Sequence, residues 1–231
     1  MPWTTCSSRR SSARCLRRVL FDTLIEVLDS EPHAAALNMA IDEALLRAAS
    51  APTLRVYRWA RPAVSFGYFG KWADAARARP EWEIVRRWTG GGIVPHGEDV
   101  TYSLVVPRVH PFFAVGPAES YRLIHECVAA VLGNALLAST VPPQISAACF
   151  ESPVLHDVLM ADRKVAGAAQ RRSKLGLLHQ GSIQCAEFDS SALSAAFSPS
   201  VFRLPLGDGV MRESAHLARE KYAANEWTRR C

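Results

Sequence analysis

The chain has 231 residues, of which 49% are hydrophobic and 21% are charged, as in an ordinary soluble globular protein. Its formal net charge is +5, but five arginines within residues 1–20 supply this excess, which leaves residues 21–231 without net charge. This balance gives no reason to expect nucleic-acid binding, and no apolar run reaches the ~18 residues of a membrane helix. We expect a disordered basic leader over residues 1–20. We expect one domain over residues 21–231, in which residues 211–231 form a C-terminal helical tail.

The first half of the chain alternates short β-rich runs with one long helix. Residues 23–28 predict a strand, and apolar residues at helical spacing predict a helix over residues 33–49. The β-rich runs 54–59 and 63–66 are joined across Arg61-Pro62, so we expect them to be neighbouring strands. The other elements expected here are a short helix at 74–78 and strands at 83–87 and 101–106.

The second half combines a long helix with a hairpin. Residues 117–137 form the longest helical pattern, with proline at its first turn. Residues 154–160 and 163–170 predict a hairpin that turns at Ala161-Asp162, and residues 176–184 predict a further strand. Short helices are expected at 191–197 and 213–222. Strands interspersed with helices indicate an α/β (α+β) domain with a mixed sheet.

Three consecutive glycines form the first candidate site. Gly90, Gly91 and Gly92 follow the predicted strand that carries Arg86 and Arg87. Their backbone N–H groups are unshielded, so the loop can cradle a carbonyl oxygen, a phosphate or a carboxylate. Because side chains alternate along a strand, only one of the two arginines can face such a site. A tight turn or bulge explains the glycines as well.

A lysine on the predicted hairpin is the second candidate. Alternation would put Lys164 on one face with Ala166, Ala168 and Gln170, where the small alanines leave a groove. An ammonium group in such a groove can stabilise negative charge that develops on an acyl carbonyl oxygen. A solvated lysine at a hairpin corner is the alternative.

Cysteine usage gives the third candidate. None of the six cysteines belongs to a Cys-x-x-Cys pair, which favours reduced thiols and a cytoplasmic setting and argues against a structural zinc site. Cys149 precedes the lysine segment in a loop-like stretch that ends at Pro153. A thiolate there would be a strong nucleophile. A buried structural cysteine is the alternative, and Cys127 and Cys185 are expected to be structural.

Polar residues beside glycines complete the candidate set. His96 follows the glycine loop, and His179 and Gln180 precede Gly181 in the last predicted strand. These side chains can supply hydrogen-bond donors to a ligand. A histidine with a local hydrogen bond at a hairpin edge accounts for them nearly as well.

Together these segments resemble the lipoate–protein ligase and octanoyltransferase family of the biotin/lipoate A/B ligase superfamily. The match runs from about residue 22 to 185 and consists of four segments in chain order. They are NMAIDEALL (38–46), RRWTGGG (86–92) continuing through His96 to TYS (101–103), RKVAGAAQR (163–171) and LHQGSI (178–183). The segment CFESP (149–153) is similar to the Cys-Phe motif of the LipM-type octanoyltransferase branch.

The resemblance implies a fold, a reaction and a set of site residues. The fold would be a mixed, mainly antiparallel sheet flanked by helices, as in biotin ligases and the related class II aminoacyl-tRNA synthetases. Cys149 would be the nucleophile and Lys164 would contact the acyl carbonyl. The substrate-binding residues would be Arg87, Gly90, Gly91, Gly92, His96, Gly167, Ala168, His179 and Gly181, and no metal ligand is expected.

The implied reaction transfers an octanoyl group from octanoyl–acyl carrier protein to a lysine of a lipoyl-carrier domain. That domain would belong to the glycine cleavage H protein or to a 2-oxoacid dehydrogenase E2. No cofactor is needed, because a thioester is already activated, and the enzyme is expected to be a monomer without membrane or nucleic-acid partners. Two alternatives stay open: a lipoate– or octanoate–protein ligase that uses ATP and Mg²⁺, and a non-catalytic lipoyl-domain-binding protein. The ATP-dependent ligase is disfavoured because only roughly 45 residues follow the last motif, where such ligases often have an accessory domain. The binding protein is kept open by Gln180, which occupies a position where the family often has histidine.

Overall fold

The computed structural model describes residues 19–139, 153–185 and 188–230. Its strands are β1 (Leu24–Leu28), β2 (Thr53–Tyr57), β3 (Ala63–Phe66), β4 (Glu83–Arg86), β5 (Ile93–His96), β6 (Val100–Pro107), β7 (Leu136–Leu137), β8 (Val158–Met160), β9 (Arg163–Arg172), β10 (Gly176–Ile183) and β11 (Val201–Pro205). Its helices are α1 (Ala35–Ala48), α2 (Trp72–Ala78), α3 (Pro117–Leu132), α4 (Ser190–Phe197), α5 (Asp208–Leu217) and α6 (Asn225–Thr228). The short helical turns are η1 (Pro111–Ala114) and η2 (Ala218–Tyr222).

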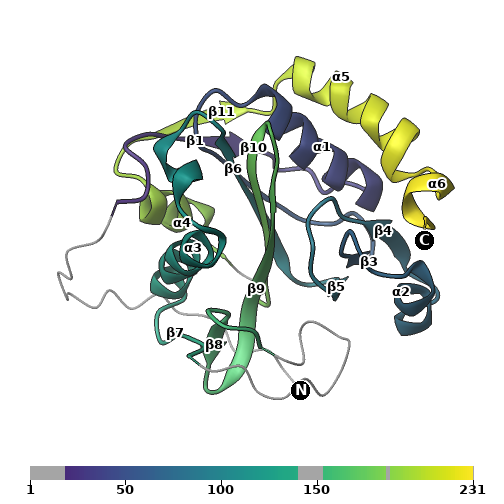
Figure 1. Cartoon of the computed structure of the whole chain (residues 1–231), viewed down its shortest axis with the longest axis horizontal. Helices are drawn as coiled ribbons and strands as arrows, with labels where there is room; N and C mark the ends of the chain where they lie inside the picture. Colours follow the sequence, from purple (N-terminus) through teal and green to yellow (C-terminus); the bar gives the residue numbers. More distant parts are fainter. Residues whose placement is uncertain (1–18, 140–152, 186–187, 231) are drawn as a thin grey trace.

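The strands form one large and one small sheet (Figure 1). The eight strands of the large sheet have the order β11-β1-β2-β6-β10-β9-β8-β7, and the three strands of the small sheet have the order β4-β3-β5. In the large sheet β1 pairs in parallel with β2 and β11, and the other neighbouring strands pair antiparallel. The predicted mixed, mainly antiparallel sheet flanked by helices is therefore confirmed.

Helices cover both faces of the large sheet. Helices α3 and α4 bury their apolar residues against one face, in a cluster that includes Leu104, Ile124 and Phe197. Helix α1 packs on the other face, where Ile41 and Leu45 lie against Val105, and α5 covers α1 from outside. Because β9 and β10 lie between these two layers, the backbone positions of the site residues that they carry are fixed by core packing.

Of two predicted strand pairings, one is wrong and the other is confirmed. The runs 54–59 and 63–66 are strands but not neighbours, since β2 belongs to the large sheet and β3 to the small one. Their connection lacks the Asn-Gly or Gly-rich pair that a tight hairpin favours. The hairpin at residues 158–172 is confirmed. Its turn residues Ala161 and Asp162 have φ angles of 47° and 60°, as a type I′ turn requires.

The helical patterns also differ from their predicted ends. The helix predicted over residues 117–137 ends at Leu132, because Gly133 adopts a φ of 85° that breaks the helix. The C-terminal helices begin at Asp208, before the predicted tail at 211. Among the described residues, no helix has the length and apolarity to cross a membrane.

A buried arginine anchors the C-terminal segment to the small sheet. Arg86 at the end of β4 donates to the carbonyl oxygens of Trp227, Thr228 and Arg230, at 2.8 to 3.1 Å. Its Nη1 atom also donates to the carbonyl oxygen of Tyr68 at 2.7 Å. The last residues of the chain are therefore held beside the loop that follows β3.

Candidate active site

A pocket lies between the large sheet and the small sheet. Strands β9 and β10 line one side of it, and β3, β5 and the glycine loop after β4 line the other. Seven residues that the sequence predicts line this pocket: Arg87, Gly91, His96, Lys164, Gly167, Ala168 and Gly181. Apolar surface comes from Met39, Tyr57, Trp59 and Val94. The lining of the pocket therefore combines charged and apolar side chains.

Lys164 is held in the pocket by a buried carboxylate. Its Nζ atom lies 2.8 Å from Oδ2 of Asp157, and both side chains are almost fully buried. Asp157 also accepts hydrogen bonds from the Tyr121 hydroxyl at 2.5 Å and from the backbone N–H of Val154 at 2.7 Å. Burial and the Asp157 carboxylate raise the pKa of Tyr121 well above its ordinary value, so its hydroxyl stays a donor. The ammonium of Lys164 thus has a fixed position.

A β-bulge corrects the predicted face of Lys164. Val158 pairs with Ala166 but Leu159 pairs with Lys164, so β9 carries one extra residue at this point. Ala166 consequently packs in the core beneath α3, and Gln170 accepts a hydrogen bond from Ser120 of that helix. The predicted face shared by Lys164, Ala166, Ala168 and Gln170 is therefore wrong.

Gly167 provides the room that the alanines were expected to leave. A Cβ atom on Gly167 would lie 2.5 Å from Cε and 2.8 Å from Nζ of Lys164. The lysine side chain therefore occupies space that any residue other than glycine would fill. This contact explains why a glycine lies three residues after the lysine in β9.

Arg87 determines how the glycine loop faces the pocket. Its Nη2 atom donates to the carbonyl oxygens of Gly90 at 3.0 Å and Gly92 at 2.9 Å. Gly91 lies between them with a φ of 84° and is the one residue of the three that lines the pocket. As alternation predicts, Arg87 faces the pocket and Arg86 faces away. Arg87 fixes the carbonyl oxygens of the loop, and the binding of a ligand by the loop's backbone N–H groups stays a prediction.

His96 belongs to a hydrogen-bonded chain that fixes Arg87. Its Nε2 atom lies 2.6 Å from the hydroxyl of Ser65, and that hydroxyl accepts from Nη1 of Arg87 at 2.6 Å. Nδ1 of His96 lies 2.8 Å from Asp99, and Trp59 stacks on the ring at 4.0 Å between centroids. Burial opposes ionisation of Asp99, but His96 and neighbouring hydroxyls outweigh it, so the pKa of Asp99 lies below its ordinary value. Both ring nitrogens are engaged in positioning.

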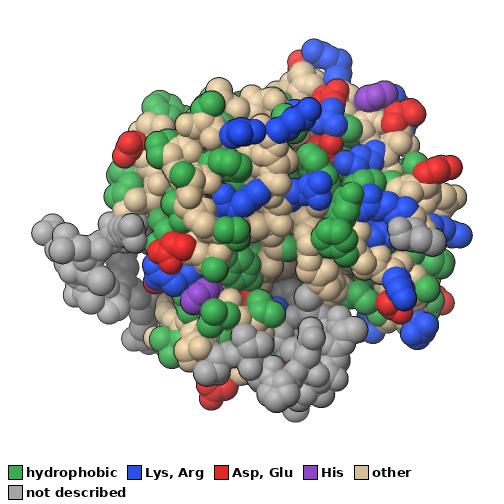
Figure 2. Space-filling model, in the orientation of Figure 1, with side chains coloured by type: hydrophobic (Ala, Val, Ile, Leu, Met, Phe, Trp, Pro, Cys, Tyr) green, Lys and Arg blue, Asp and Glu red, His purple; other side chains and the backbone are tan. Residues whose placement is uncertain are grey.

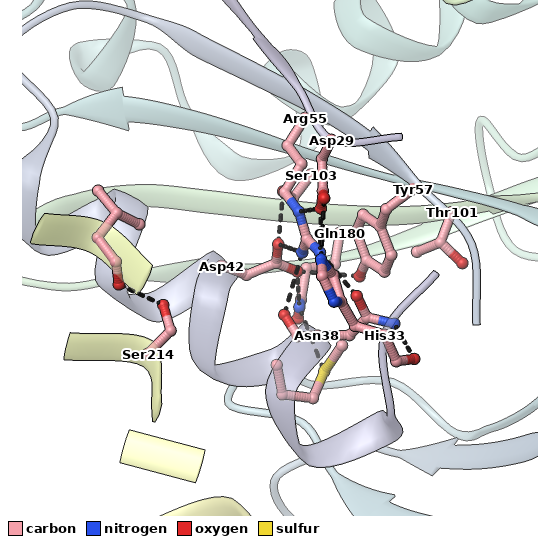
Figure 3. A network of polar contacts seen from close by, with 12 residues as sticks. Asp29, His33, Asn38, Asp42, Arg55, Tyr57, Thr101, Ser103, Gln180 and Ser214 are labelled. Carbon is pink, nitrogen blue, oxygen red and sulfur yellow. Dashed lines mark hydrogen bonds and ion pairs between the residues drawn. The ribbon is translucent and has the colours of Figure 1, made fainter. Parts of the chain in front are cut away.

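Gln180, not His179, contributes the side chain from β10 to the pocket. Its Nε2 atom donates to Asp42 at 2.7 Å, and its Oε1 atom accepts from Thr89 at 2.7 Å. Figure 3 shows Gln180, Arg55 and Tyr57 directed toward the carboxylate of Asp42 on α1. Gln180 therefore joins the buried network below the pocket to the base of the glycine loop.

His179 points to the opposite face of the sheet, which corrects its prediction as a ligand contact. Its ring lies 3.0 Å from the Tyr102 hydroxyl and 3.1 Å from Gln170. Burial and the neighbouring His125 hold the pKa of His179 well below its ordinary value. Burial likewise lowers the pKa of His125 to about 4. Both imidazoles are neutral parts of the core beneath α3.

Sequence reasoning missed four residues that position the site: Asp157, Tyr121, Ser65 and Asp42. Asp157 gives the clearest signal, because an acid on the first strand of a hairpin can meet a lysine on the second. Asp42 belongs to the segment NMAIDEALL, but that segment gives no role to its carboxylate. Tyr121 and Ser65 come from distant elements. Cys149, the predicted nucleophile, lies outside the described residues, and the described chain resumes at Pro153.

Comparisons with known proteins show the family of the chain. Residues 34–202 match the family described as Lipoyl protein ligase A/B catalytic domain. The octanoyltransferase LipM of Kyrpidia tusciae is 38% identical over 185 residues, which cover 70% of this chain and 66% of that protein. The octanoyltransferase LipM of Geobacillus kaustophilus is 33% identical over 88% of this chain and 78% of its own length. A crystal structure of lipoate-protein ligase A bound with ATP has a TM-score of 0.67 at 20% identity, over 88% of this chain and 97% of that one.

The chain therefore belongs to the lipoyl protein ligase A/B catalytic domain family. Within it, the similar curated sequences named above are octanoyltransferases of the LipM type. The match to the Kyrpidia tusciae protein spans slightly less than two thirds of that protein. The solved ligase structure shares the fold with this chain.

Proposed function

We propose that the protein is an octanoyltransferase that modifies lipoyl-carrier domains. It takes the octanoyl group from octanoyl–acyl carrier protein, holds it as a thioester on Cys149 and passes it to a lysine of the carrier domain. The observation that carries the proposal is the buried Lys164 ammonium, which Asp157 holds at the edge of an apolar pocket. Similarity to LipM octanoyltransferases supports the choice of acyl group and acceptor.

The first step transfers the acyl group to the enzyme. The thiolate of Cys149 attacks the thioester carbonyl, and negative charge develops on the carbonyl oxygen. The Lys164 ammonium stabilises this oxyanion, and a preorganised donor of this kind is typically worth about 3–4 kcal/mol. The carbon–sulfur bond of the donor then breaks and releases the carrier as a thiolate, which takes a proton from solvent. Cys149 precedes Val154 by five residues, and Val154 donates to the same carboxylate that holds Lys164.

The second step forms an amide. The neutral amine of the acceptor lysine attacks the acyl-enzyme carbonyl, and the same ammonium stabilises the second oxyanion. The carbon–nitrogen bond forms, the bond to the Cys149 sulfur breaks, and the amine releases a proton. The octanoyl chain occupies the apolar part of the pocket, against Met39, Tyr57 and Trp59. A thioester donor supplies the activation, so the reaction consumes no nucleotide.

The second candidate is an ATP-dependent lipoate– or octanoate–protein ligase. The solved neighbour that binds ATP motivates this alternative through its shared fold. In it the glycine loop would contact the phosphate of an acyl adenylate. Arg87 donates to two carbonyl oxygens of that loop, whereas a phosphate would accept from its N–H groups, so the loop geometry is compatible with both functions and the assay below separates them.

The partners of the proposed reaction are proteins. The donor is octanoyl–acyl carrier protein, and the acceptor is the lipoyl domain of the glycine cleavage H protein or of a 2-oxoacid dehydrogenase E2. The enzyme acts as a monomer in the cytoplasm, where its thiols stay reduced. A non-catalytic lipoyl-domain-binding protein would form the same complex without adding mass to the domain.

One assay separates these functions. A lipoyl domain is incubated with enzyme and octanoyl–acyl carrier protein without ATP, or with free octanoate, ATP and Mg²⁺. We expect octanoylated domain in the first mixture, and its loss in Cys149→Ala and Lys164→Met. Product in the second mixture alone would identify a ligase, and a complex without product in either mixture would identify a binding protein.

A further inference from the structure

Three cationic side chains converge on aromatic rings next to the pocket, and we name Arg171, Lys221 and Arg230 the cation cluster. The guanidinium carbons of Arg171 and Arg230 lie 4.7 and 3.6 Å from the ring centre of Tyr68. Arg171 and Lys221 also lie 4.9 and 4.6 Å from the ring centre of Trp88. Nη2 of Arg230 donates to the carbonyl oxygen of Tyr68 at 3.0 Å. A cation stacked on a ring can donate its remaining N–H groups to a ligand.

The cluster comes from two distant parts of the chain. Arg171 is on β9, which also lines the pocket, whereas Lys221 and Arg230 lie beyond the 34–202 segment that matches the family. Arg86 binds the carbonyl oxygen of Arg230 and so holds this end of the chain against the loop at Tyr68. Figure 2 shows Lys and Arg side chains gathered over the region between the upper part of β9 and helices α5 and α6.

The local environment favours a bound anion. The buried Nε atom of Arg171 has no hydrogen-bond partner among the described residues. The pKa of the Tyr68 phenol lies below its ordinary value, because Arg230 donates a hydrogen bond to it and the charges of Arg230, Arg171 and Lys221 add to this effect. Glu43 balances part of the charge, since it lies 2.6 Å from Nζ of Lys221. The other two members of the cluster are arginines, which suit the oxygens of a phosphate group.

The distance from the reacting centre identifies the kind of anion. Arg171 follows Gly167 by four residues, and a strand of that length spans about 13 Å. The Lys164 ammonium lies beside Gly167, and Ala168 and Ala169 line the pocket between the two points. In a phosphopantetheine arm, the number of bonds from the sulfur to the phosphorus is about that of the backbone of four to five residues. The extended arm is therefore roughly 15 Å long. A thioester carbonyl at Lys164 therefore brings the phosphate of such an arm to Arg171.

We propose that Arg171, Lys221 and Arg230 bind the phosphate of the donor's phosphopantetheine arm, and that the arm runs along β9 from the cluster to Lys164. This inference rests on the proposed transferase function. The donor is then recognised through its prosthetic group, near the reacting bond. A nucleotide is the other source of a phosphate that can occupy this position.

The test compares two small donors that differ only in the phosphate: octanoyl-4′-phosphopantetheine and octanoyl-pantetheine. Wild-type enzyme should use the phosphorylated donor with a kcat/KM about 10- to 100-fold higher, as expected for charge-assisted hydrogen bonds. The double variant Arg171→Gln/Arg230→Gln should reduce this ratio to about 1 while its kcat/KM for octanoyl-pantetheine changes less than about twofold. Arg219→Gln, an exposed arginine in the same C-terminal segment, is the matched control and should keep the wild-type ratio.

Other outcomes overturn the inference in distinct ways. Equal use of both donors by wild type, or an unchanged ratio in the double variant, refutes phosphate binding by the cluster and leaves the transferase intact. An equal loss on both donors would show that the arginines only support the fold, which circular dichroism melting checks. A third outcome concerns competition with octanoyl-pantetheine. If ATP competes in wild type but not in the double variant, and 4′-phosphopantetheine does not compete at all, the cluster binds a nucleotide. Transfer from neither donor, nor from octanoyl–acyl carrier protein, contradicts the proposed function itself.

Discussion

Gly167→Ala tests whether the position of the Lys164 ammonium limits the reaction. The added Cβ would lie 2.5 Å from Cε and 2.8 Å from Nζ of Lys164, so the flexible lysine must move away. Removing one preorganised oxyanion donor typically costs 100- to 1,000-fold in kcat, or about 3–4 kcal/mol. The free energy of unfolding should fall by only about 1–2 kcal/mol, because Asp157 keeps its hydrogen bonds from Tyr121 and Val154.

The assay measures octanoyl transfer to a lipoyl domain under saturating donor, together with urea unfolding of each variant. Lys164→Met should lower kcat by a similar factor, and the double variant should be no worse than either single variant, since both remove the same interaction. Gly209→Ala is the matched control, because a Cβ at that helical position meets nothing within 4 Å. A kcat within threefold of wild type for Gly167→Ala, or losses that multiply in the double variant, would refute the reasoning.

Three further predictions concern stability. Burial lowers the pKa of His125 to about 4, so the unfolded state binds a proton that the folded state excludes. The contribution of His125 to stability is present above pH ~6.5 and should decrease by roughly 3 kcal/mol as the pH falls toward 4. Because burial also lowers the pKa of His179, His125→Asn should reduce this dependence without abolishing it, in urea unfolding at pH 7 and 4.5. Asp42→Ala removes a fully buried carboxylate from Arg55 and should cost about 3–5 kcal/mol; a loss under 1 kcal/mol in chemical denaturation would show that the network adds little. Gly181→Ala brings a Cβ within 2.3 Å of the buried Tyr102 ring and should lower stability by about 1–3 kcal/mol, with an unchanged melting temperature as the contrary result.

Local pattern was enough to predict most of the strands, the main helices and the hairpin that carries Lys164, but not β5, β7 and β11. Apolar periodicity and turn residues act over a few neighbours, and they are present in the sequence around Ala161-Asp162 and in the helix that starts at Pro117. The separation of β2 and β3 into two sheets could not be predicted in this way, because it depends on which distant strands compete for each edge.

The sequence predicted which residues form the candidate site better than it predicted the directions of their side chains. Arg87, Gly91, Lys164 and Gly167 meet in one pocket, as their shared motifs suggested. The bulge at Val165 has no local sequence signal, and one extra residue reverses which side chains face the pocket. Because neighbouring side chains of a strand point to opposite faces, Gln180 reaches the pocket and His179 does not.

Buried partners from distant elements were beyond local reasoning altogether. Only the pairing of Asp157 with Lys164 has a local signal, because the two lie seven residues apart in one hairpin region; the contact of Asp157 with Tyr121 on α3 requires the folded arrangement of helix and sheet. Ser65 on β3 and Asp99 in the loop between β5 and β6 fix His96, and the contact of either residue with His96 depends on elements brought together by folding. Such positioning residues emerge only from the tertiary structure.

The most direct test of the central claim is the intact mass of the enzyme after incubation with octanoyl–acyl carrier protein alone. The account predicts the added mass of one octanoyl group, sensitive to hydroxylamine, present in wild type and absent in Cys149→Ala. It also predicts that a lipoyl domain added afterwards removes this mass and acquires it. An unmodified enzyme that still octanoylates the domain, or a Cys149→Ala variant with wild-type activity, would contradict the acyl-enzyme mechanism.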